Sequence, residues 1–168
     1  MIANNNIFLL GFMGSGKSTL GKKLAKQRSL PFYDLDDEIE AQEKKTIAQI
    51  FEEKGEDGFR EIEAQLLKKL TQQSTNFVLA LGGGTPCFYD NMKIINQSGI
   101  SIYIKYNAGI LCSRLINAKA QRPLIAGKTK EELLSFIEET LIVREEYYNQ
   151  SQFIIEGNNI KVEDLLVL

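Results

Sequence analysis

The chain has 168 residues, of which 43% are hydrophobic and 25% are charged, values typical of one globular domain spanning residues 1–168. Its net charge of −2 lacks the basic excess of nucleic-acid-binding proteins, and no polybasic run suggests a membrane surface. The absence of histidine excludes catalytic triads, Cys-His pairs and histidine-ligated metals. Because the first residues also lack a signal-peptide pattern, we expect a cytoplasmic protein that binds neither nucleic acid nor membrane.

The first strong feature is a glycine-rich loop at residues 11–19, with the sequence GFMGSGKST. It fits the pattern G-x-x-x-x-G-K-[ST] of the phosphate-binding P-loop. An apolar run at residues 7–10 predicts a buried strand before the loop, and helical spacing of apolar residues predicts a helix at 20–28 after it. This order of strand, loop and helix is the context that the motif requires, so the sequence predicts binding of a nucleoside triphosphate.

The residue types in the loop suit a phosphate group. Glycines allow positive φ angles, which turn backbone N–H groups inward around an anion, and the following helix adds the positive end of its dipole. Lys17 can reach the β- and γ-phosphates, and the Ser18 hydroxyl can join the shell of Mg²⁺. The expected nucleotide-binding residues of the loop are Gly14, Ser15, Gly16, Lys17, Ser18 and Thr19.

The rest of the chain alternates between predicted strands and helices. Apolar runs predict four further strands, at residues 30–33, 76–81, 100–106 and 152–155. Helical spacing and start or stop signals predict helices from Asp37 and at 46–54, 56–71, 90–97, 108–117, 129–149 and 162–168. This alternation favours right-handed βαβ units, and hence an α/β fold with a mostly parallel sheet of about five strands.

Two acids follow the strand predicted at residues 30–33. Asp34 and Asp36 are two residues apart, so in an extended chain their side chains point the same way. One acid can then join a metal shell while the other accepts a proton or hydrogen bond from a substrate hydroxyl. The alternative is a helix N-cap plus a solvated acid, because Asp37 and Glu38 follow directly.

Two arginines occupy unusual positions on the predicted helices. Arg60 precedes Glu63 by three residues, and Glu63 falls on an apolar stripe. Arg144 lies seven residues beyond Ile137, in line with the buried face of its helix. A charge on such a face requires a partner or a cleft, unless the side chain snorkels to water. Two arginines that reach a shared cleft could clamp a carboxylate.

Two loops complete the set of features. Three consecutive glycines at 82–84 follow the strand predicted at 76–81, which indicates close approach of a ligand to the backbone rather than only a tight turn. Arg122 precedes Pro123 in a polar loop at about 117–128. That loop is either a lid that brings positive charge to a transferring phosphoryl group or an ordinary surface loop.

Taken in chain order, these motifs resemble those of the shikimate kinase family, within the nucleoside-monophosphate-kinase-like P-loop fold. The matching segments cover nearly the whole chain: residues 11–19, 32–40, 55–63, 82–84, 122–124 and 144–148. The resemblance implies a three-layer fold whose five-stranded parallel sheet has the order 2-3-1-4-5. It also implies a substrate-binding insertion at about 34–62 and a lid at about 117–128.

The resemblance implies phosphorylation of the 3-hydroxyl of shikimate by ATP with Mg²⁺, a step towards chorismate and the aromatic amino acids. The implied catalytic residues are Lys17, Asp36 and Arg122, and Arg122 also binds the nucleotide. The implied metal ligands are Ser18 and Asp34. The implied substrate-binding residues are Asp36, Arg60, Gly82, Gly83, Gly84 and Arg144, with Glu63 steadying the substrate-site arginine. We expect a monomer whose partners are the small molecules ATP and shikimate.

Two other functions fit parts of the sequence. A related small-molecule kinase, such as a gluconate kinase, would share the P-loop, but the two arginines match a carboxylate on a compact ring. A nucleotide-binding switch without kinase activity would share the fold. The chain lacks the N-K-x-D signature of guanine recognition, which argues against a GTPase.

Overall fold

The computed structural model describes residues 5–118 and 123–168, and within them five parallel strands form one sheet. The strands are β1 (Asn6–Leu10), β2 (Phe32–Asp34), β3 (Val78–Ala80), β4 (Gly99–Lys105) and β5 (Phe153–Glu156). Their order, β2-β3-β1-β4-β5, confirms the predicted topology. Central β1 pairs with β3 on one side and β4 on the other, and all five of its residues are buried, as expected of a parallel sheet covered on both faces.

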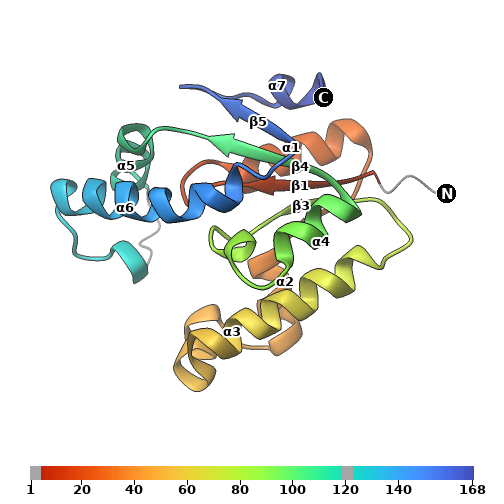
Figure 1. Cartoon of the computed structure of the whole chain (residues 1–168), viewed down its shortest axis with the longest axis horizontal. Coiled ribbons are helices and arrows are strands. Elements are labelled where there is room, and N and C mark those ends of the chain that lie inside the picture. The colour runs from red at the N-terminus through yellow and green to blue at the C-terminus, as the bar shows by residue number, and fades with distance from the viewer. Residues whose placement is uncertain (1–4, 119–122) are drawn as a thin grey trace.

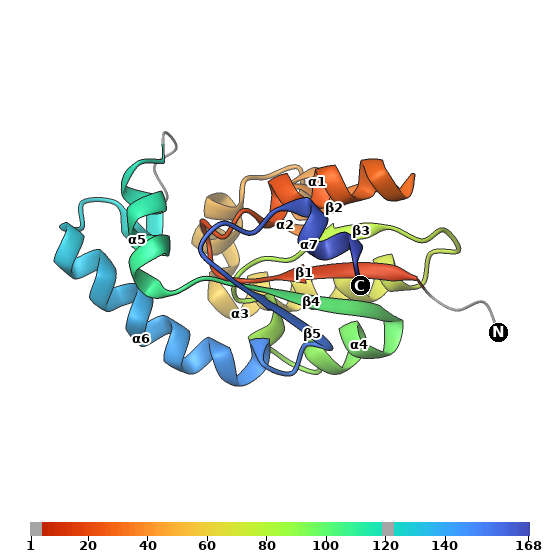
Figure 2. The same cartoon turned by 90° about the horizontal axis from the view of Figure 1, so that it is seen from above.

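Helices cover both faces of the sheet. Figure 2 shows α1 and α7 on one side of the strands and α4 and α6 on the other. The α-helices are α1 (Lys17–Arg28), α2 (Leu35–Glu43), α3 (Ile47–Thr71), α4 (Asn91–Ser98), α5 (Ala108–Ile116), α6 (Lys130–Tyr148) and α7 (Val162–Leu166). Single turns of 3₁₀ helix, η1 (Thr85–Cys87) and η2 (Pro123–Ile125), precede α4 and α6.

Local sequence signals account for where the two longest helices begin. Thr46 starts α3 and Thr129 starts α6, each with a capping box in which Gln49 or Glu132 bonds back to the cap. Along α6, Leu133, Ile137 and Leu141 recur every four residues and are buried, so one face of this helix packs into the core.

The structure shifts one predicted helix start and confirms one predicted break between helices. The helix after the P-loop begins at Lys17, earlier than predicted, because the loop itself supplies its first turn. The two helices predicted at 46–54 and 56–71 are confirmed as the two segments of α3, which meet at a break at Gly55, where φ is 68° and ψ is −175°. The turns η1 and η2 were not predicted, since three-residue elements carry no periodic signal.

The carboxyl edge of the sheet gathers the features singled out in the sequence. The P-loop follows β1, Asp36 follows β2, and the glycines at 82–84 follow β3 shortly after its end. Figure 1 shows α5 and the first turns of α6 extending beyond this same edge. In open α/β sheets this edge is where ligands bind. Within the described residues, no helix combines the length and apolar character needed to cross a membrane.

Candidate active site

The P-loop has the backbone of an anion-binding turn. Gly14 and Gly16 have φ values of 81° and 85°, in the left-handed region where residues with a side chain are strained. Gly16 is the N-cap of α1, so the free N–H groups of this helix lie directly behind the loop. The buried Lys17 donates from Nζ to the carbonyls of Gly11 (2.7 Å) and Phe12 (3.0 Å), which places its ammonium against the loop.

A short hydrogen bond joins the P-loop helix to the end of β2. Ser18 Oγ donates to Asp34 Oδ2 at 2.5 Å, and Asp34 Oδ1 accepts the backbone N–H of Asp36 at 3.1 Å. Asp34 is thus the N-cap of α2, and Asp36 lies in the first helical turn. The expectation of an extended segment from 34 to 36 is wrong, because the Asp34 side chain itself starts a helix there.

The Ser18 and Asp34 oxygens are suited to Mg²⁺. Hydroxyl and carboxylate oxygens are ligands that this hard cation prefers, and they already lie 2.5 Å apart. Mg²⁺ commonly keeps several waters and takes its other ligands from substrate phosphates, so it needs few protein ligands. The donor set therefore fits the metal that the sequence implied.

A cavity of about 520 Å³ brings together the residues predicted to bind substrate. They come from α2, α3, the loop after β3, and α6, and they are Asp36, Arg60, Gly82, Gly83, Gly84 and Arg144. Ile47, Phe51 and Phe59 of α3 supply an apolar wall. A cavity with one apolar wall, an acid and two cations suits a small polar molecule that carries a negative charge.

Arg60 is held within this cavity by several contacts. Its Nη1 donates to Glu63 Oε1 at 2.7 Å, and Glu63 is only 1% exposed. The guanidinium carbon lies 4.2 Å from the centre of the Phe88 ring. Buried Nε has no hydrogen-bond partner among the described residues and lies 3.7 Å from the Glu56 carboxylate. One side of this arginine is therefore fixed, and another nitrogen remains able to donate.

Arg144 reaches the same cavity from α6. Its guanidinium carbon lies 5.5 Å from the centre of the Phe12 ring, and its buried Nη1 has no hydrogen-bond partner among the described residues. A buried, unpaired donor on a charged group is costly, and a bound acceptor would offset that cost. Arg60 and Arg144 each retain such a donor, and a carboxylate could accept from both.

The three glycines allow these arginines to lie against the backbone. A Cβ atom on Gly83 would lie 2.8 Å from Arg144 Nη1, and one on Gly84 would lie 2.9 Å from Arg60 Cζ. A Cβ on Gly82 would lie 3.2 Å from an oxygen of Asp36. The sequence predicted that a ligand would lie close to the backbone of these glycines. In this structure the groups that lie close to that backbone are the side chains of Asp36, Arg60 and Arg144.

The cavity raises the pKa of Asp36 to about 6 from its usual 3.8. Loss of water around the carboxyl is the largest cause, followed by the negative charges of Asp34 and Glu63, while Lys17 and Arg60 act in the opposite direction. The residue stays accessible to solvent through the cavity. A carboxylate with a pKa near neutrality is well matched to accepting a proton from a hydroxyl group.

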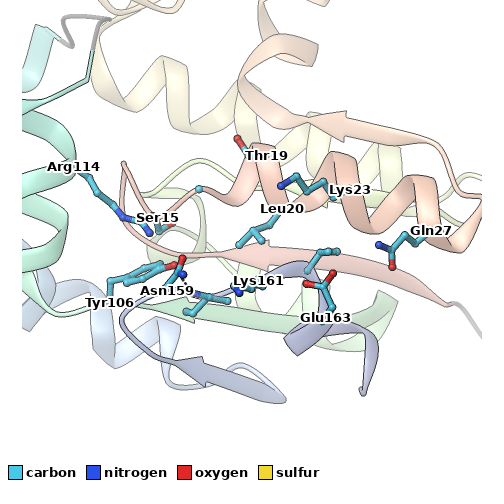
Figure 3. A pocket seen from close by; sticks show the side chains of 13 residues that line it. Ser15, Thr19, Leu20, Lys23, Gln27, Tyr106, Arg114, Asn159, Lys161 and Glu163 are labelled. Atoms are coloured by element: carbon cyan, nitrogen blue, oxygen red, sulfur yellow. Dashed lines mark hydrogen bonds between the residues drawn. The ribbon is translucent and has the colours of Figure 1, made fainter.

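A second cavity, of about 610 Å³, runs from the P-loop along α1. Ser15, Gly16 and Thr19 line it together with residues distant in sequence, and Figure 3 shows Arg114 and Tyr106 beside Ser15 at one end. The two cavities together flank the P-loop, since Met13 lines the first and Ser15 the second.

Tyr106 is a site residue that the sequence did not indicate, and it lies beside Arg114. The Arg114 guanidinium carbon lies 4.1 Å from the centre of the Tyr106 ring, and its Nη1 donates to the Gly14 carbonyl at 3.3 Å. Tyr106 in turn accepts the backbone N–H of Ile160 at 2.9 Å. These contacts join α5 and the loop before α7 to the P-loop, and no motif in the sequence indicates them.

The predicted lid is described only in part. Arg122 lies outside the described residues. Within the described part, Leu124 of η2 is 62% exposed and also lines the cavity that contains Arg60 and Arg144.

Comparison with known proteins agrees with this geometry. A family model described as shikimate kinase matches residues 13–167. A shikimate kinase of Azobacteroides pseudotrichonymphae is 42% identical over 160 residues, 95% of this chain and 94% of the relative. The crystal structure of shikimate kinase from Bacteroides thetaiotaomicron is 40% identical with a TM-score of 0.91, covering 98% of this chain and 99% of that one. The enzyme from Acinetobacter baumannii, solved in complex with shikimate, is 36% identical with a TM-score of 0.82, covering 96% and 88%.

Proposed function

The chain belongs to the shikimate kinase family, and we propose that its two cavities hold ATP and shikimate on opposite sides of the P-loop. It catalyses ATP-dependent phosphorylation of the 3-hydroxyl of shikimate, giving shikimate 3-phosphate and ADP on the route to chorismate and the aromatic amino acids. The observation that carries the assignment of the acceptor cavity is a pair of buried arginine nitrogens, Arg60 Nε and Arg144 Nη1, that have no hydrogen-bond partner among the described residues, in the cavity that also contains Asp36.

The acceptor is held at its carboxylate. Arg60 and Arg144 each donate to this group, and the fixed planes of their guanidinium groups give the ring one orientation. The backbone of Gly82, Gly83 and Gly84 forms the adjoining wall, and apolar side chains of α3 cover the ring. This arrangement rejects an acceptor without a carboxylate, because one buried nitrogen of each arginine would then stay without a hydrogen-bond acceptor.

The nucleotide is held by the P-loop. The loop amides and the ammonium of Lys17 bind the β- and γ-phosphates. Ser15, Gly16 and Thr19 line the cavity of about 610 Å³ that runs along α1. Arg114 and Tyr106 border the end of the cavity where the nucleoside portion would lie. Arg122, which lies outside the described residues, would supply positive charge that stabilises the transferring group.

Asp36 receives the acceptor hydroxyl. It orients the attacking oxygen and accepts its proton as the phosphoryl group is transferred, a role for which a pKa of about 6 is suited. Phosphoryl transfer depends mainly on positioning and charge stabilisation, so acids, a lysine and arginines suffice without histidine.

Ser18 and Asp34 would hold Mg²⁺. The ion, when bound with ATP, neutralises charge on the β- and γ-phosphate oxygens.

We also propose that residues 34–62 form the substrate-binding insertion and residues 117–128 the lid of a single domain, and that the chain acts as a monomer in the cytoplasm. Bacterial relatives of nearly the same length support this domain assignment.

Calorimetric titration with shikimate and with its methyl ester tests how the acceptor is held. The wild-type protein should bind the ester at least about tenfold more weakly, because esterification removes the charge that the arginines bind. In the double variant Arg60→Ala/Arg144→Ala both compounds should bind weakly and about equally. Equal affinity of the wild-type protein for the acid and the ester would contradict the proposal.

A further inference from the structure

Glu63 is a buried carboxylate whose two oxygens have different partners. Oε1 accepts from Arg60 Nη1 at 2.7 Å, and Oε2 accepts from the hydroxyl of Thr85 at 2.7 Å. Glu63 is 1% exposed and Thr85 is fully buried. Water is therefore a poor substitute for either partner, and the direction of the Glu63 carboxylate depends on both.

The η1 turn that carries Thr85 is fixed in place. The backbone N–H of Thr85 donates to the Gly82 carbonyl at 3.1 Å, and the Thr85 carbonyl accepts from Asn91 Nδ2 at 2.9 Å. Asn91 is itself fully buried at the start of α4. The Thr85 hydroxyl is thus presented to Glu63 from a turn that is bonded on both sides.

The same segment contacts Arg60 directly. The ring of Phe88 lies under the guanidinium carbon at 4.2 Å, and the missing Cβ of Gly84 leaves room for the guanidinium group. Segment 84–88 therefore constrains Arg60 by an aromatic ring, by the backbone, and through Glu63.

We propose that Thr85 is a positioning residue for acceptor binding, acting through Glu63 on the orientation of Arg60. Thr85 is not among the residues that line the acceptor cavity, so its effect is transmitted rather than made by contact. Without the hydroxyl, Glu63 Oε2 loses its donor in a dry environment, and the carboxylate turns to recover a hydrogen bond. Arg60 then shares this movement, and its Nε, which has no hydrogen-bond partner among the described residues, is no longer placed to donate to the acceptor carboxylate. This inference rests on the proposed function and refines it.

Thr85→Val removes the hydroxyl and keeps the shape of the side chain. We expect the KM for shikimate to rise about tenfold with the KM for ATP little changed. Thr85→Ser, which restores the hydroxyl, should return the KM for shikimate close to the wild-type value. Thr140→Val is a matched control, because the Thr140 hydroxyl also makes a hydrogen bond, to the Phe136 carbonyl at 2.6 Å, but lines neither cavity.

A double-variant cycle separates transmission through Arg60 from general damage. If Thr85 acts through Arg60, adding Thr85→Val to Arg60→Ala should change the KM for shikimate little further. A full tenfold increase in the Arg60→Ala background would overturn the proposal. So would an unchanged KM for shikimate in folded Thr85→Val, or an equal rise in the KM for ATP.

Thermal unfolding establishes that the variants are folded. If Thr85→Val does not fold, Thr85→Ala replaces it with the same expectations and the same comparison with Thr85→Ser. Turnover of shikimate by the wild-type protein tests the proposed function separately from the positioning role of Thr85. Absence of that turnover would contradict the proposed function, whereas normal turnover with an unchanged Thr85 variant would contradict only the positioning role.

Discussion

Single residues at this site are recognisable because they are charged where the surroundings are apolar. Glu63 lies on the buried face of α3 and Arg144 on that of α6, and each contacts or borders the acceptor cavity. A charge in such a position destabilises the folded chain unless it has a partner. For Glu63 the partners are within the chain, whereas Arg144 retains a nitrogen that a ligand can satisfy.

Arg144→Ala should raise the KM for shikimate at least about thirtyfold, because it removes a buried charged donor to the acceptor carboxylate. The KM for ATP should change little, since Arg144 lines only the acceptor cavity. Steady-state kinetics with each substrate varied in turn measures both values. Arg28→Ala is the control, because Arg28 is exposed and bonds only the Leu166 carbonyl among the described residues. Equal increases in the KM for shikimate and the KM for ATP would indicate a structural role of Arg144 instead.

Asp36→Asn should lower kcat by about 10²- to 10⁴-fold, because the amide cannot accept the proton of the acceptor hydroxyl. ATP binding, measured by titration, should stay close to that of the wild-type protein. Asp37→Asn is a matched control one residue along α2, where the side chain is exposed and lines neither cavity. A kcat for Asp36→Asn near the wild-type value would exclude a proton-accepting role.

At the scale of elements, the start of α2 combines a structural and a proposed catalytic task in one side chain. Asp34 caps the helix through Oδ1 and accepts the Ser18 hydroxyl through Oδ2. The sequence left the cap and the metal ligand as alternatives, but the two oxygens of one carboxylate allow both.

Two substitutions of Asp34 separate these tasks. Asn caps helices about as well as Asp, so Asp34→Asn should keep the melting temperature while raising the Mg²⁺ concentration needed for half-maximal activity. Asp34→Ala should show the same Mg²⁺ effect and also lose about 1 kcal/mol of unfolding free energy. Thermal unfolding and Mg²⁺ titration of turnover give the two readouts. An unchanged Mg²⁺ requirement in both variants would contradict a metal role.

The break in α3 directs two helical segments to one cavity. Ile47 and Phe51 before Gly55, and Phe59 and Arg60 after it, all line the acceptor cavity. The φ of 68° and ψ of −175° at Gly55 lie in a region that only glycine adopts readily, so the position of this residue sets the change of direction.

Gly55→Ala should lower the unfolding free energy by about 1–3 kcal/mol, the usual cost of such a strained backbone. The strain is of the backbone alone, because beyond the neighbouring helix backbone no atom of the described residues lies within 4 Å of the position a Cβ would take. If the chain relaxes the strain by straightening α3, the KM for shikimate should rise as well. Chemical denaturation measures the first effect, and an unchanged stability would show that the break does not depend on glycine.

At the scale of the whole molecule, the parallel sheet follows from the alternation of strand and helix patterns, whereas its strand order and the residues of the acceptor cavity were implied by the resemblance to the shikimate kinase family. Parallel βαβ units bring the segments after β1, β2 and β3 to one edge, so motifs far apart in the chain could be assigned to one place. The roles of these residues remain predictions, although the structure brings the described ones together.

Other features of the site could not be predicted, for identifiable physical reasons. The contacts of Tyr106 with Arg114 and with the backbone of Ile160 are tertiary contacts, which leave no periodic or spaced pattern. The support that Thr85 gives to Glu63 depends on a three-residue turn.

The measurement that tests the central claim most directly is ADP formation by the purified chain with ATP and Mg²⁺, comparing shikimate, gluconate, a nucleoside monophosphate and no acceptor. We expect shikimate to stimulate ADP formation strongly and the other additions to leave it near the rate without acceptor, because only shikimate combines a compact ring, hydroxyls and a carboxylate for Arg60 and Arg144. No stimulation by shikimate, or equal stimulation by gluconate, would contradict this account of the site.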